Sequence, residues 1–451
     1  MNYDEAIAYW FGRINYEVRS AGPLDLKLER MRALLRLLGN PQDRLRIVHV
    51  TGTKGKGSTS AMLAAVLRAA GYRVGLFTSP HLVHVEERTR IDGVPISHDE
   101  LATNITTIAA AVRELDASPL PPPTFFEIGT ALGFLHFVNR RVDVAIVEVG
   151  LGGRFDSTNV CSPLVSVITS IGLDHTPQLG TTLEAIAFQK AGIIKQRVPV
   201  VSGVTEPAPQ AVIRRVAVEC HAPLIERGRD FDSDYHPAKF VGESSQRRHP
   251  QVTVTTSQRR YPDFTMNLLG AHQASNAALV VATVEQLRKA GMPIPDAALA
   301  TGFAEVRWPA RIEVMSTRPV VILDTAHNVP SIDALLKTLA ETFPEVRGRK
   351  SVVFAVSSDK QYPDMLRRLS SDFDRFHLCR FGSNPRSVPP EKLAELLHGF
   401  GVRDGVFVHS TASIAWQCAL SEAGAEDLVC VTGSVFLAGE IRSVGYSDSP
   451  G

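Results

Sequence analysis

A short segment rich in glycine and lysine, Thr51-Gly-Thr-Lys-Gly-Lys-Gly-Ser-Thr59, has the residue types of a phosphate-binding loop. Glycines let backbone N–H groups turn toward phosphate oxygens, Lys56 supplies a cation, and Ser58 can offer a hydroxyl to Mg²⁺. The spacing departs from GxxxxGK[ST], because Gly52 is too close to the lysine and Gly57 stands before Ser58. A flexible turn is the alternative, but a strand pattern before the loop and a helix pattern after it favour binding of a nucleotide phosphate.

Further ionisable residues follow the next strand patterns. Glu148 ends the apolar run Val144–Glu148, where a phosphate loop needs a carboxylate for its metal ion, because ligands bind at the carboxyl ends of parallel strands. Asp174 and His175 follow the next apolar run and are expected at a comparable edge. A solvated glutamate and a hydrogen-bonded structural histidine are the alternatives. Lys190, taken alone, is typical of an ordinary helix lysine.

The elements that position these residues are predicted from short β-branched runs that alternate with helical patterns. Two helices are expected between Tyr3 and Leu38, and the phosphate loop lies between the strand Arg46–Val50 and the helix Thr59–Ala70. Such alternation predicts parallel sheets covered by helices. The remaining predicted strands are Tyr72–Phe77, Val142–Val149, Leu164–Thr169, Val198–Ser202, Val320–Leu323, Ser351–Val356, Phe376–Cys379 and Leu428–Thr432.

Length and composition define the class of protein. The 451 residues are enough for two domains, which we place at 1–305 and 306–451, with the polar segment 227–262 as a surface hairpin or an excursion from the sheet. With Lys+Arg 48 and Asp+Glu 47, the net charge of +1 gives no field for nucleic acid or anionic membranes. We find no spanning apolar run and no CxxC pair among the five cysteines, and because the residues Met1–Glu5 lack a basic and an apolar region we expect no signal peptide. The expectation is a cytoplasmic protein with no nucleic-acid or membrane partner, and a monomer.

Taken together, the motifs resemble the Mur ligase superfamily and, within it, the folylpolyglutamate synthase and dihydrofolate synthase family. They occur in the family's order along nearly the whole chain, and the combination is far more specific than any one motif. The motifs are Gly52-Thr-Lys-Gly-Lys-Gly-Ser58, Thr78-Ser-Pro-His-Leu82, Glu87-Arg-Thr-Arg-Ile91, Phe125-Phe-Glu127, Glu148-Val-Gly-Leu-Gly-Gly-Arg154, Gly270-Ala-His-Gln273 with Asn276, and Thr432-Gly-Ser434.

The resemblance implies an α/β fold with an N-terminal phosphate-loop domain that binds ATP and folate, and a smaller Rossmann-like C-terminal domain for glutamate ligation. The implied reaction is ATP-dependent addition of L-glutamate to folate, and in many bacteria also to dihydropteroate, through an acyl phosphate. The alternatives are another Mur-type carboxylate–amine ligase, or a nucleotide-responsive binding protein. The second alternative is disfavoured because the residues expected to bind metal are all present.

The resemblance also implies the metal ligands and the catalytic residues. Ser58 and Glu148 correspond to ligands of a first Mg²⁺, and Glu148, His175 and Lys190 surround a second. A lysine ammonium has no lone pair, so the resemblance further implies that CO₂ carbamylates Lys190. Gln189 stands before it where the family usually has Glu. Lys56, Lys190, His175 and Arg311 are the expected catalytic residues.

Ligand contacts are carried over residue by residue. For ATP they are the loop residues Gly52, Thr53, Lys54, Gly55, Lys56, Gly57, Ser58 and Thr59, with Asn276, Arg311 and Asp324. For the pterin-bearing substrate they are Ser79, Pro80, His81, Phe126, Arg154 and Asp156, and for glutamate His327, Arg386 and Ser434. Core packing of Phe126 and helix capping by Ser434 are the alternative roles. Ala310 and Val329 depart from the family pattern, and a hinge is expected near Arg307–Pro309 that closes the domains over the acyl phosphate.

Overall fold

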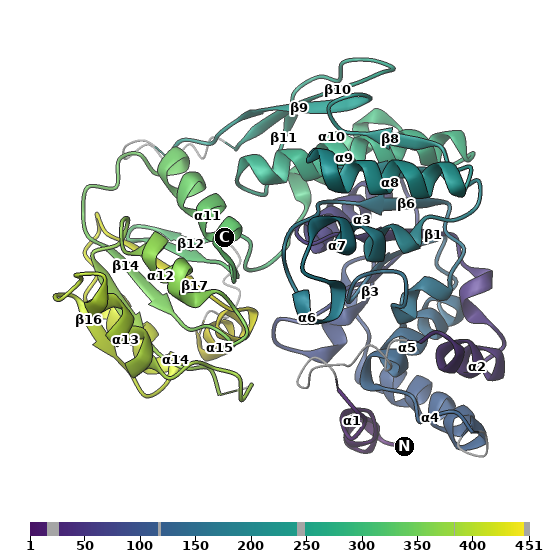
Figure 1. The fold of residues 1–451 in the computed structure, drawn as a ribbon, viewed down its shortest axis with the longest axis horizontal. Coiled ribbons are helices and arrows are strands. Elements are labelled where there is room, and N and C mark those ends of the chain that lie inside the picture. The colour runs from purple at the N-terminus through teal and green to yellow at the C-terminus, as the bar shows by residue number, and fades with distance from the viewer. Residues whose placement is uncertain (16–26, 116–118, 241–248, 383, 446–451) are drawn as a thin grey trace. The chain divides into compact units, whose positions relative to one another are not determined.

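The computed structural model describes residues 1–15, 27–115, 119–240, 249–382 and 384–445, and the chain forms two compact units (Figure 1). The first unit comprises Met1–Asp234, Val252–Thr265 and Gln273–Val306. The second comprises Tyr235–Gln251, Met266–His272 and Arg307–Gly451. The chain thus enters the second unit briefly, twice, before it completes the first.

An eight-stranded sheet forms the centre of the first unit, in the order β4-β3-β2-β5-β1-β6-β7-β8. From β2 to β8 the neighbours are parallel, whereas β3 and β4 add antiparallel strands at one end. The central strands are continuous buried runs, as expected for parallel strands that are covered on both faces. Their bounds are β1 Ile47–Thr51, β2 Val74–Phe77, β3 Thr89–Ile91, β4 Val94–Pro95, β5 Val144–Glu148, β6 Val165–Ile168, β7 Val200–Ser202 and β8 Leu224–Glu226.

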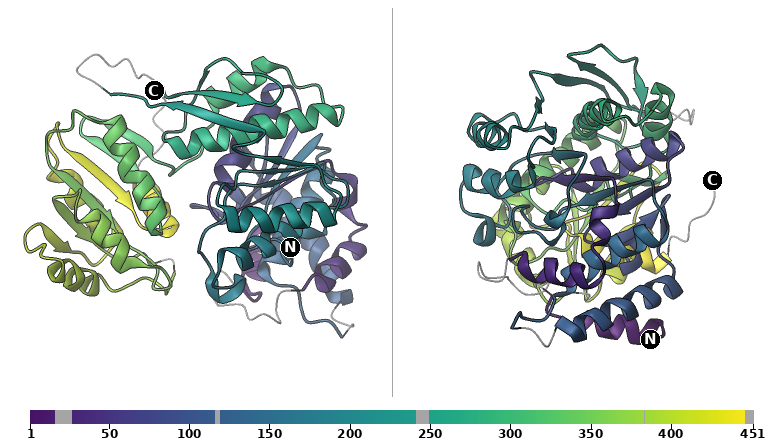
Figure 2. Two further views of the ribbon diagram at one scale, coloured as in Figure 1. Left: turned by 45° about the horizontal axis from the view of Figure 1, so that its top comes forward. Right: turned by 90° about the vertical axis from the view of Figure 1, so that its right-hand side faces the viewer.

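Helices lie on both faces of this sheet (Figures 1 and 2). Helices α1, α2, α4 and α5 share one apolar core with the sheet, which includes Trp10, Phe77 and Phe137. Helix α3 packs against β1, β2 and β5 and against α10, and α7 packs against α8. The bounds are α1 Tyr3–Phe11, α2 Glu29–Leu37, α3 Lys56–Ala69, α4 His98–Leu115, α5 Phe125–Asn139, α6 Thr176–Leu179, α7 Leu183–Lys190, α8 Pro207–Glu219, α9 Ala271–Lys289 and α10 Asp296–Glu305.

The second unit is built on a six-stranded sheet in the order β12-β13-β17-β14-β15-β16, parallel except for β12. Helices α11, α12 and α13 bury apolar residues against it, and α14 and α15 contact it as well. The strands are β12 Glu313–Thr317, β13 Val320–Leu323, β14 Lys350–Phe354, β15 Arg375–Leu378, β16 Val406–Val408 and β17 Leu428–Thr432. The helices are α11 Val329–Thr342, α12 Tyr362–Leu369, α13 Pro390–Gly399, α14 Ala412–Ser421 and α15 Val435–Gly445.

The polar segment 227–262 leaves the main sheets, as the sequence predicts. It contributes β9 (Phe231–His236) and β10 (Gln251–Thr256) to a small three-stranded sheet with β11 (Phe264–Thr265). Residues 241–248, which include most of the basic part of this segment, lie outside the described residues. The predicted fold class is confirmed, because both units have a parallel sheet flanked by helices.

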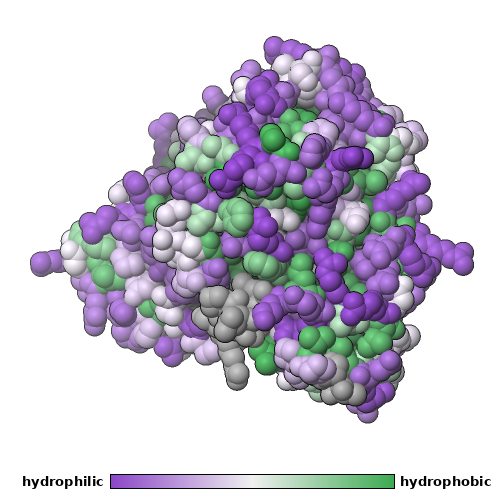
Figure 3. Space-filling view, turned by 45° about the vertical axis from the view of Figure 1, so that its right-hand side comes forward, coloured by the Kyte–Doolittle hydropathy of each residue, from purple (hydrophilic) through white to green (hydrophobic). Residues whose placement is uncertain are grey.

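Hydrophilic side chains predominate on the face shown in Figure 3, with apolar residues scattered between them. Among the exposed large apolar residues are Phe155, Leu173 and Phe188, all in loops or helices that follow strands of the first sheet. Within the described residues, no helix combines the length and the apolar character needed to cross a membrane.

Candidate active site

The phosphate loop lies at the carboxyl edge of the first sheet, between β1 and α3. Val50 pairs with Glu148 and Thr51 pairs with Ile168, so the ends of β5 and β6 flank the point where the loop begins. Gly52 has φ +155°, and a Cβ there would lie 1.8 Å from the Thr169 hydroxyl oxygen. A side chain at this position therefore has no room, because the loop approaches the neighbouring strand end too closely.

Hydrogen bonds from the segment after β6 fix the phosphate loop. The Thr53 N–H donates to the Ser170 carbonyl at 2.8 Å, and the Lys54 N–H donates to the Ser170 hydroxyl at 2.9 Å. The Thr169 hydroxyl donates to the Lys54 carbonyl at 2.5 Å. The Lys54 ammonium also pairs with Asp174 at 3.0 Å. Lys54 therefore ties the loop to the segment that carries His175, in addition to its predicted role toward ATP.

Two lysines meet at one backbone oxygen. Lys56 Nζ and Lys190 Nζ donate to the Gly52 carbonyl at 3.2 and 2.9 Å, and Lys56 Nζ lies 4.0 Å from Glu148 Oε1. Lys190 is 4% exposed, and burial, with Lys56 nearby, lowers the pKa of its amine well below its usual range. The structure thus brings Lys190, which is 134 residues after Lys56, into contact with the phosphate loop. Such an amine is the form that reacts with CO₂.

The predicted oxygen ligands are present at this edge. Ser58 lies in the first turn of α3 and accepts from the Gln273 amide at 3.3 Å, and Glu148 accepts from the Ser79 N–H at 3.4 Å. Both side chains are buried, and a hydroxyl beside a carboxylate suits Mg²⁺. The described residues contain no group of three or more His, Cys, Asp and Glu that would hold a metal ion. The predicted sets include only two such residues, Glu148 and His175, so that absence does not decide them.

His175 occupies an unusual backbone position. It has φ +50° and precedes the short helix α6, and its N–H donates to Asp174 at 3.0 Å. Its side chain is 48% exposed, with Nε2 at 3.9 Å from Asp174 Oδ1. Its role as a ligand of a second metal ion stays a prediction.

Asn276 lies beside the phosphate loop on helix α9. Its amide donates to Gln273 at 3.0 Å, and its side-chain oxygen is so close to Gly55 that a Cβ there would be 2.6 Å away. Gly55 has φ +84°, so both its conformation and its neighbour require glycine. Gln273 was visible in the sequence only as part of a motif, and the structure links it to both Ser58 and Asn276.

The candidate residues for the pterin-bearing substrate lie in two loops of the first unit, except for Phe126, which lies in the first turn of helix α5. His81 Nδ1 accepts from Arg88 at 2.9 Å, and Glu87 holds the loop of Ser79 and His81 by accepting from the N–H groups of Leu82, Val83 and His84. Burial opposes the ionised form of Glu87, but these backbone donors and Arg90 hold its pKa below the usual value. The sequence offered Glu87 only as part of a motif, without this role.

The second of these loops follows β5. Arg154 stacks over the Phe188 ring at 4.0 Å and donates to the Phe188 carbonyl at 3.3 Å. The Phe126 ring lies against Gly150, where a Cβ would be 2.4 Å from it. Asp156 is buried and accepts from the Leu151 N–H and from Thr158, so the contacts described for its carboxylate lie within its own loop. Contacts of these residues with a substrate stay predictions.

In the second unit, Asp324 and Arg311 lie at the carboxyl end of β13. Asp324 is buried and accepts from the N–H groups of Ile312 and Ala326 at 3.1 and 2.6 Å, and burial raises its pKa in spite of these donors. Arg311 donates to the Thr325 hydroxyl and to the Ala310 carbonyl. Ala310, where the family pattern has glycine, adopts φ +55°.

The candidate glutamate-binding residues also follow strands of this sheet. His327 Nδ1 lies 2.9 Å from the Thr325 carbonyl, and the Arg386 guanidinium lies 3.7 Å from Asp359. The Ser434 hydroxyl accepts from the Phe436 N–H at 3.1 Å at the start of α15, which is the capping role weighed as its alternative. Their roles in glutamate binding stay predictions.

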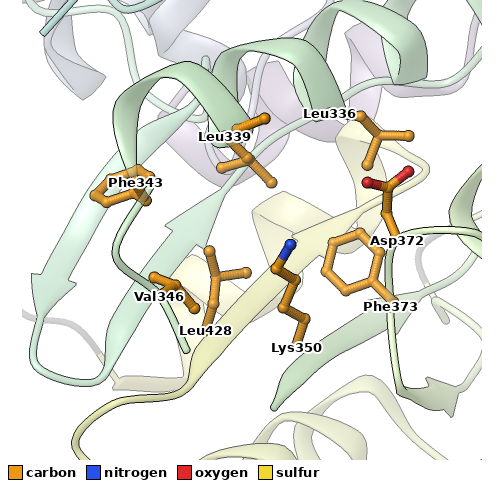
Figure 4. Close-up of a pocket in the computed structure, with 9 residues that line it drawn as sticks. Leu336, Leu339, Phe343, Val346, Lys350, Asp372, Phe373 and Leu428 are labelled. Carbon is orange, nitrogen blue, oxygen red and sulfur yellow. The ribbon is translucent and has the colours of Figure 1, made fainter. Parts of the chain in front are cut away.

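A small hollow in the second unit lies away from these residues (Figure 4). Apolar side chains line it, together with Lys350 and Asp372. Lys350 begins β14 and Leu428 begins β17, so the hollow is at the amino ends of the strands, opposite the edge that carries Asp324. We assign it no role.

Comparison with known proteins defines the class. Residues 50–284 match the model of the Mur ligase middle domain, and residues 310–435 match the Mur ligase glutamate ligase domain. The fold and the phosphate-loop site are therefore those of a Mur ligase.

Individual relatives show to which family of Mur ligases the chain belongs. The chain is 37% identical over 98% of both chains to a dihydrofolate synthase/folylpolyglutamate synthase of Bacillus subtilis, and 36% identical, again over 98% of both, to a folylpolyglutamate synthase of Lacticaseibacillus casei. The structure of E. coli FolC in complex with DHPP and ADP superposes with a TM-score of 0.83, at 30% identity and over 98% of this chain and 97% of that chain. The chain belongs to the folylpolyglutamate synthase/dihydrofolate synthase family of Mur ligases, as its sequence motifs indicate.

Proposed function

We propose that this protein is an ATP-dependent ligase that joins L-glutamate to a folate, with dihydropteroate as a second acceptor. The proposal rests on the arrangement at the phosphate loop, where Lys56 of the loop and Lys190 of α7 both donate to the Gly52 carbonyl beside Glu148. Membership of the family and the ADP and DHPP in a related structure support ATP and a pterin-bearing acceptor.

The chemistry requires two displacements. A carboxylate oxygen of the acceptor bonds to the γ-phosphorus of ATP, the bond to the ADP oxygen breaks, and an acyl phosphate forms. The glutamate amine then attacks the acyl carbon, inorganic phosphate leaves, and the nitrogen loses a proton to give the amide. Lys56 and the N–H groups of the loop offset negative charge on the moving phosphoryl group, and fixed geometry lowers the barrier further. No enzyme nucleophile is needed.

Ser58 and Glu148 are the residues that would hold Mg²⁺ in the first unit. When bound, Mg²⁺ neutralises charge on the phosphate oxygens. The buried hydroxyl and carboxylate are hard oxygen donors at the end of the phosphate loop, which is the fit that the ion requires. His175 and Lys190 are proposed for a second ion.

Lys190 is proposed to act as a carbamate. Its unprotonated nitrogen would attack the carbon of CO₂, form an N–C bond and release a proton, which leaves an anionic oxygen donor. The burial of Lys190 and the neighbouring ammonium of Lys56 favour the neutral amine that this reaction needs. The contact with Gly52 places the nitrogen at the phosphate loop.

The remaining candidate residues are assigned to the acceptor, to ATP and to the incoming glutamate. We propose that Ser79, Pro80, His81, Phe126, Arg154 and Asp156 form the acceptor site, and that Asn276, Asp324 and Arg311 contact ATP. We propose that His327, Arg386 and Ser434 bind the incoming glutamate, because a guanidinium and polar groups suit an α-carboxylate. That the protein is cytoplasmic and monomeric, and that it has no nucleic-acid or membrane partner, stays a prediction.

Phosphate release tests the proposed function. The assay contains ATP, Mg²⁺ and L-glutamate, with tetrahydrofolate, dihydropteroate or no acceptor, and product masses are read in parallel. Release that requires both acceptor and glutamate, with a mass gain of one glutamyl residue, supports the ligase. Release with other carboxylate and amine pairs only would indicate a different Mur-type ligase. Tight nucleotide binding without turnover would indicate a binding protein.

A further inference from the structure

Strand β1 carries a completely buried histidine, His49, at its centre. His49 is 0% exposed, and burial, together with Lys195 nearby, lowers its pKa to about 3. The imidazole is therefore neutral, and placing such a polar ring in a strand core is costly unless it is hydrogen-bonded. Its Nε2 lies 2.8 Å from the Thr158 hydroxyl oxygen.

The hydrogen bond between Thr158 and Asp156 shows which group donates in the contact between His49 and Thr158. Thr158 Oγ1 donates to Asp156 Oδ1 at 2.5 Å, and a carboxylate can only accept. The single proton of the hydroxyl is used there, so the hydroxyl oxygen accepts from His49 Nε2–H. This fixes the tautomer and leaves Nδ1 as a bare acceptor, which agrees with its having no hydrogen-bond partner among the described residues.

Asp156 completes the chain of hydrogen bonds by holding the loop after β5. Its Oδ1 also accepts from the Thr158 N–H at 3.0 Å, and its Oδ2 accepts from the Leu151 N–H at 2.9 Å. The two ends of the loop 151–158 are thereby joined through one carboxylate. Arg154 projects from the middle of this loop onto Phe188.

A second residue on the same face of β1 holds the same loop. Thr51 lies two positions after His49, on the same side of the strand, and its hydroxyl donates to the Gly152 carbonyl at 2.7 Å. Thr51 also opens the phosphate-loop segment, so this bond links the two loops directly, whereas Thr53 and Lys54 of the phosphate loop are held by Ser170. The contacts from His49 through Thr158 to Asp156 therefore reach the loop of Arg154 without passing through Ser170.

We propose that His49 and Thr158 are positioning residues for the acceptor substrate, because they set the conformation of the loop 151–158 that presents Arg154. This inference rests on the proposed function. It predicts different effects on the two substrates, because loss of the His49–Thr158–Asp156 hydrogen bonds weakens use of the pterin-bearing acceptor and leaves nucleotide binding intact. Neither residue touches the reacting atoms.

The test uses the full-length protein and isosteric substitutions at Thr158. Thr158→Val removes the hydroxyl at nearly constant shape, and Thr158→Ser keeps it. For Thr158→Val we expect kcat/KM for the acceptor to fall about tenfold or more, with KM for ATP and the Kd for ADP within about twofold of wild type, since hydrogen bonds to charged groups carry this order of effect. We expect Thr158→Ser to stay within about threefold of wild type in every parameter.

Two substitutions at His49 provide an independent test. His49→Phe removes the donor and His49→Gln retains one, so His49→Phe is expected to reproduce the acceptor defect and His49→Gln to lessen it. This pair decides the matter if Thr158→Val does not fold. In the double variant His49→Phe/Thr158→Val the two losses should be less than additive, because both partners of one contact are gone.

Three outcomes would overturn the inference. One is a folded Thr158→Val with unchanged acceptor kinetics. Another is a loss of ADP affinity equal to the loss for the acceptor, which would show a general structural role. The third is a Thr158→Ser variant as impaired as Thr158→Val. If the wild-type protein itself has no acceptor-dependent turnover, the proposed function is wrong, and this inference, which rests on it, is wrong as well.

Discussion

Replacing Lys190 tests its proposed role as a carbamylated ligand and measures how much its amine contributes to stability. The Lys190 amine makes one described hydrogen bond, to the Gly52 carbonyl at 2.9 Å, and Lys56 also donates to that oxygen at 3.2 Å. Lys190→Ala therefore leaves the carbonyl with a donor, and it removes an amine whose burial disfavours its charged form. We expect the free energy of unfolding to change by no more than about 2 kcal/mol, the sum of one hydrogen bond and a shortened buried chain.

The effect on activity should be far larger. If a carbamate on Lys190 holds a metal ion, its loss removes a charged oxygen from the phosphoryl-transfer site, and we expect kcat to fall by about 100-fold or more. Lys190→Met and Lys190→Ala should behave alike, since neither can form a carbamate. Urea titration measures the stability and phosphate release measures the turnover.

Carbon dioxide gives a direct readout of the modification. Wild-type activity should fall in CO₂-free buffer and recover on addition of bicarbonate, and ¹³C-labelled CO₂ should give a carbamate signal by NMR. The Lys190→Ala variant should show neither response. Near-normal turnover in a folded Lys190→Ala protein, or a wild-type protein indifferent to CO₂ with no carbamate signal, would refute the reasoning.

Two further substitutions test the loops of the acceptor site. Gly150→Ala places a Cβ 2.4 Å from the Phe126 ring, so we expect a higher acceptor KM and a stability loss of about 1–3 kcal/mol. In the control Gly172→Ala, the new Cβ lies 3.7 Å from its nearest atom, so this variant should be nearly neutral. Equal effects of the two substitutions in steady-state kinetics would contradict the proposed role of the contact between Gly150 and Phe126. Glu87→Gln should cost about 1–3 kcal/mol at pH 7 in urea unfolding. The pKa of Glu87 is lowered in the folded state, so its contribution is present above the unfolded pKa and is lost as pH falls through the folded one, and the difference from wild type should shrink in acid. A constant difference down to low pH would contradict this.

The buried interior of the fold was predictable, and its edges were not. Strands β1, β5, β13 and β17 are continuous buried apolar runs, and the sequence predicts each of them closely. The outermost strands β4, β8, β12 and β16 have few fully buried residues and were missed. An edge strand packs on fewer neighbours, so its sequence need not be continuously apolar.

The candidate site divides in the same way. The phosphate loop was predictable because a strand, a glycine-rich turn and a helix lie in one short segment. Glu148 was predictable because it ends a separate, continuously apolar strand run. The contact of Lys190 with Gly52 required the fold, because the two residues are 138 positions apart. Likewise, the roles of Ser170 and of His49 depend on partners supplied by other strand ends, and periodicity along one strand carries no information about them.

Whether this protein joins glutamate to a folate is decided by glutamate-dependent phosphate release with ATP and Mg²⁺, measured with tetrahydrofolate, with dihydropteroate and without an acceptor. We predict release only when acceptor and L-glutamate are both present, with a product heavier by one glutamyl residue, and loss of that release in Lys190→Ala. Phosphate release that is indifferent to every pterin-bearing acceptor, or no turnover at all by a protein that binds ADP, would contradict it.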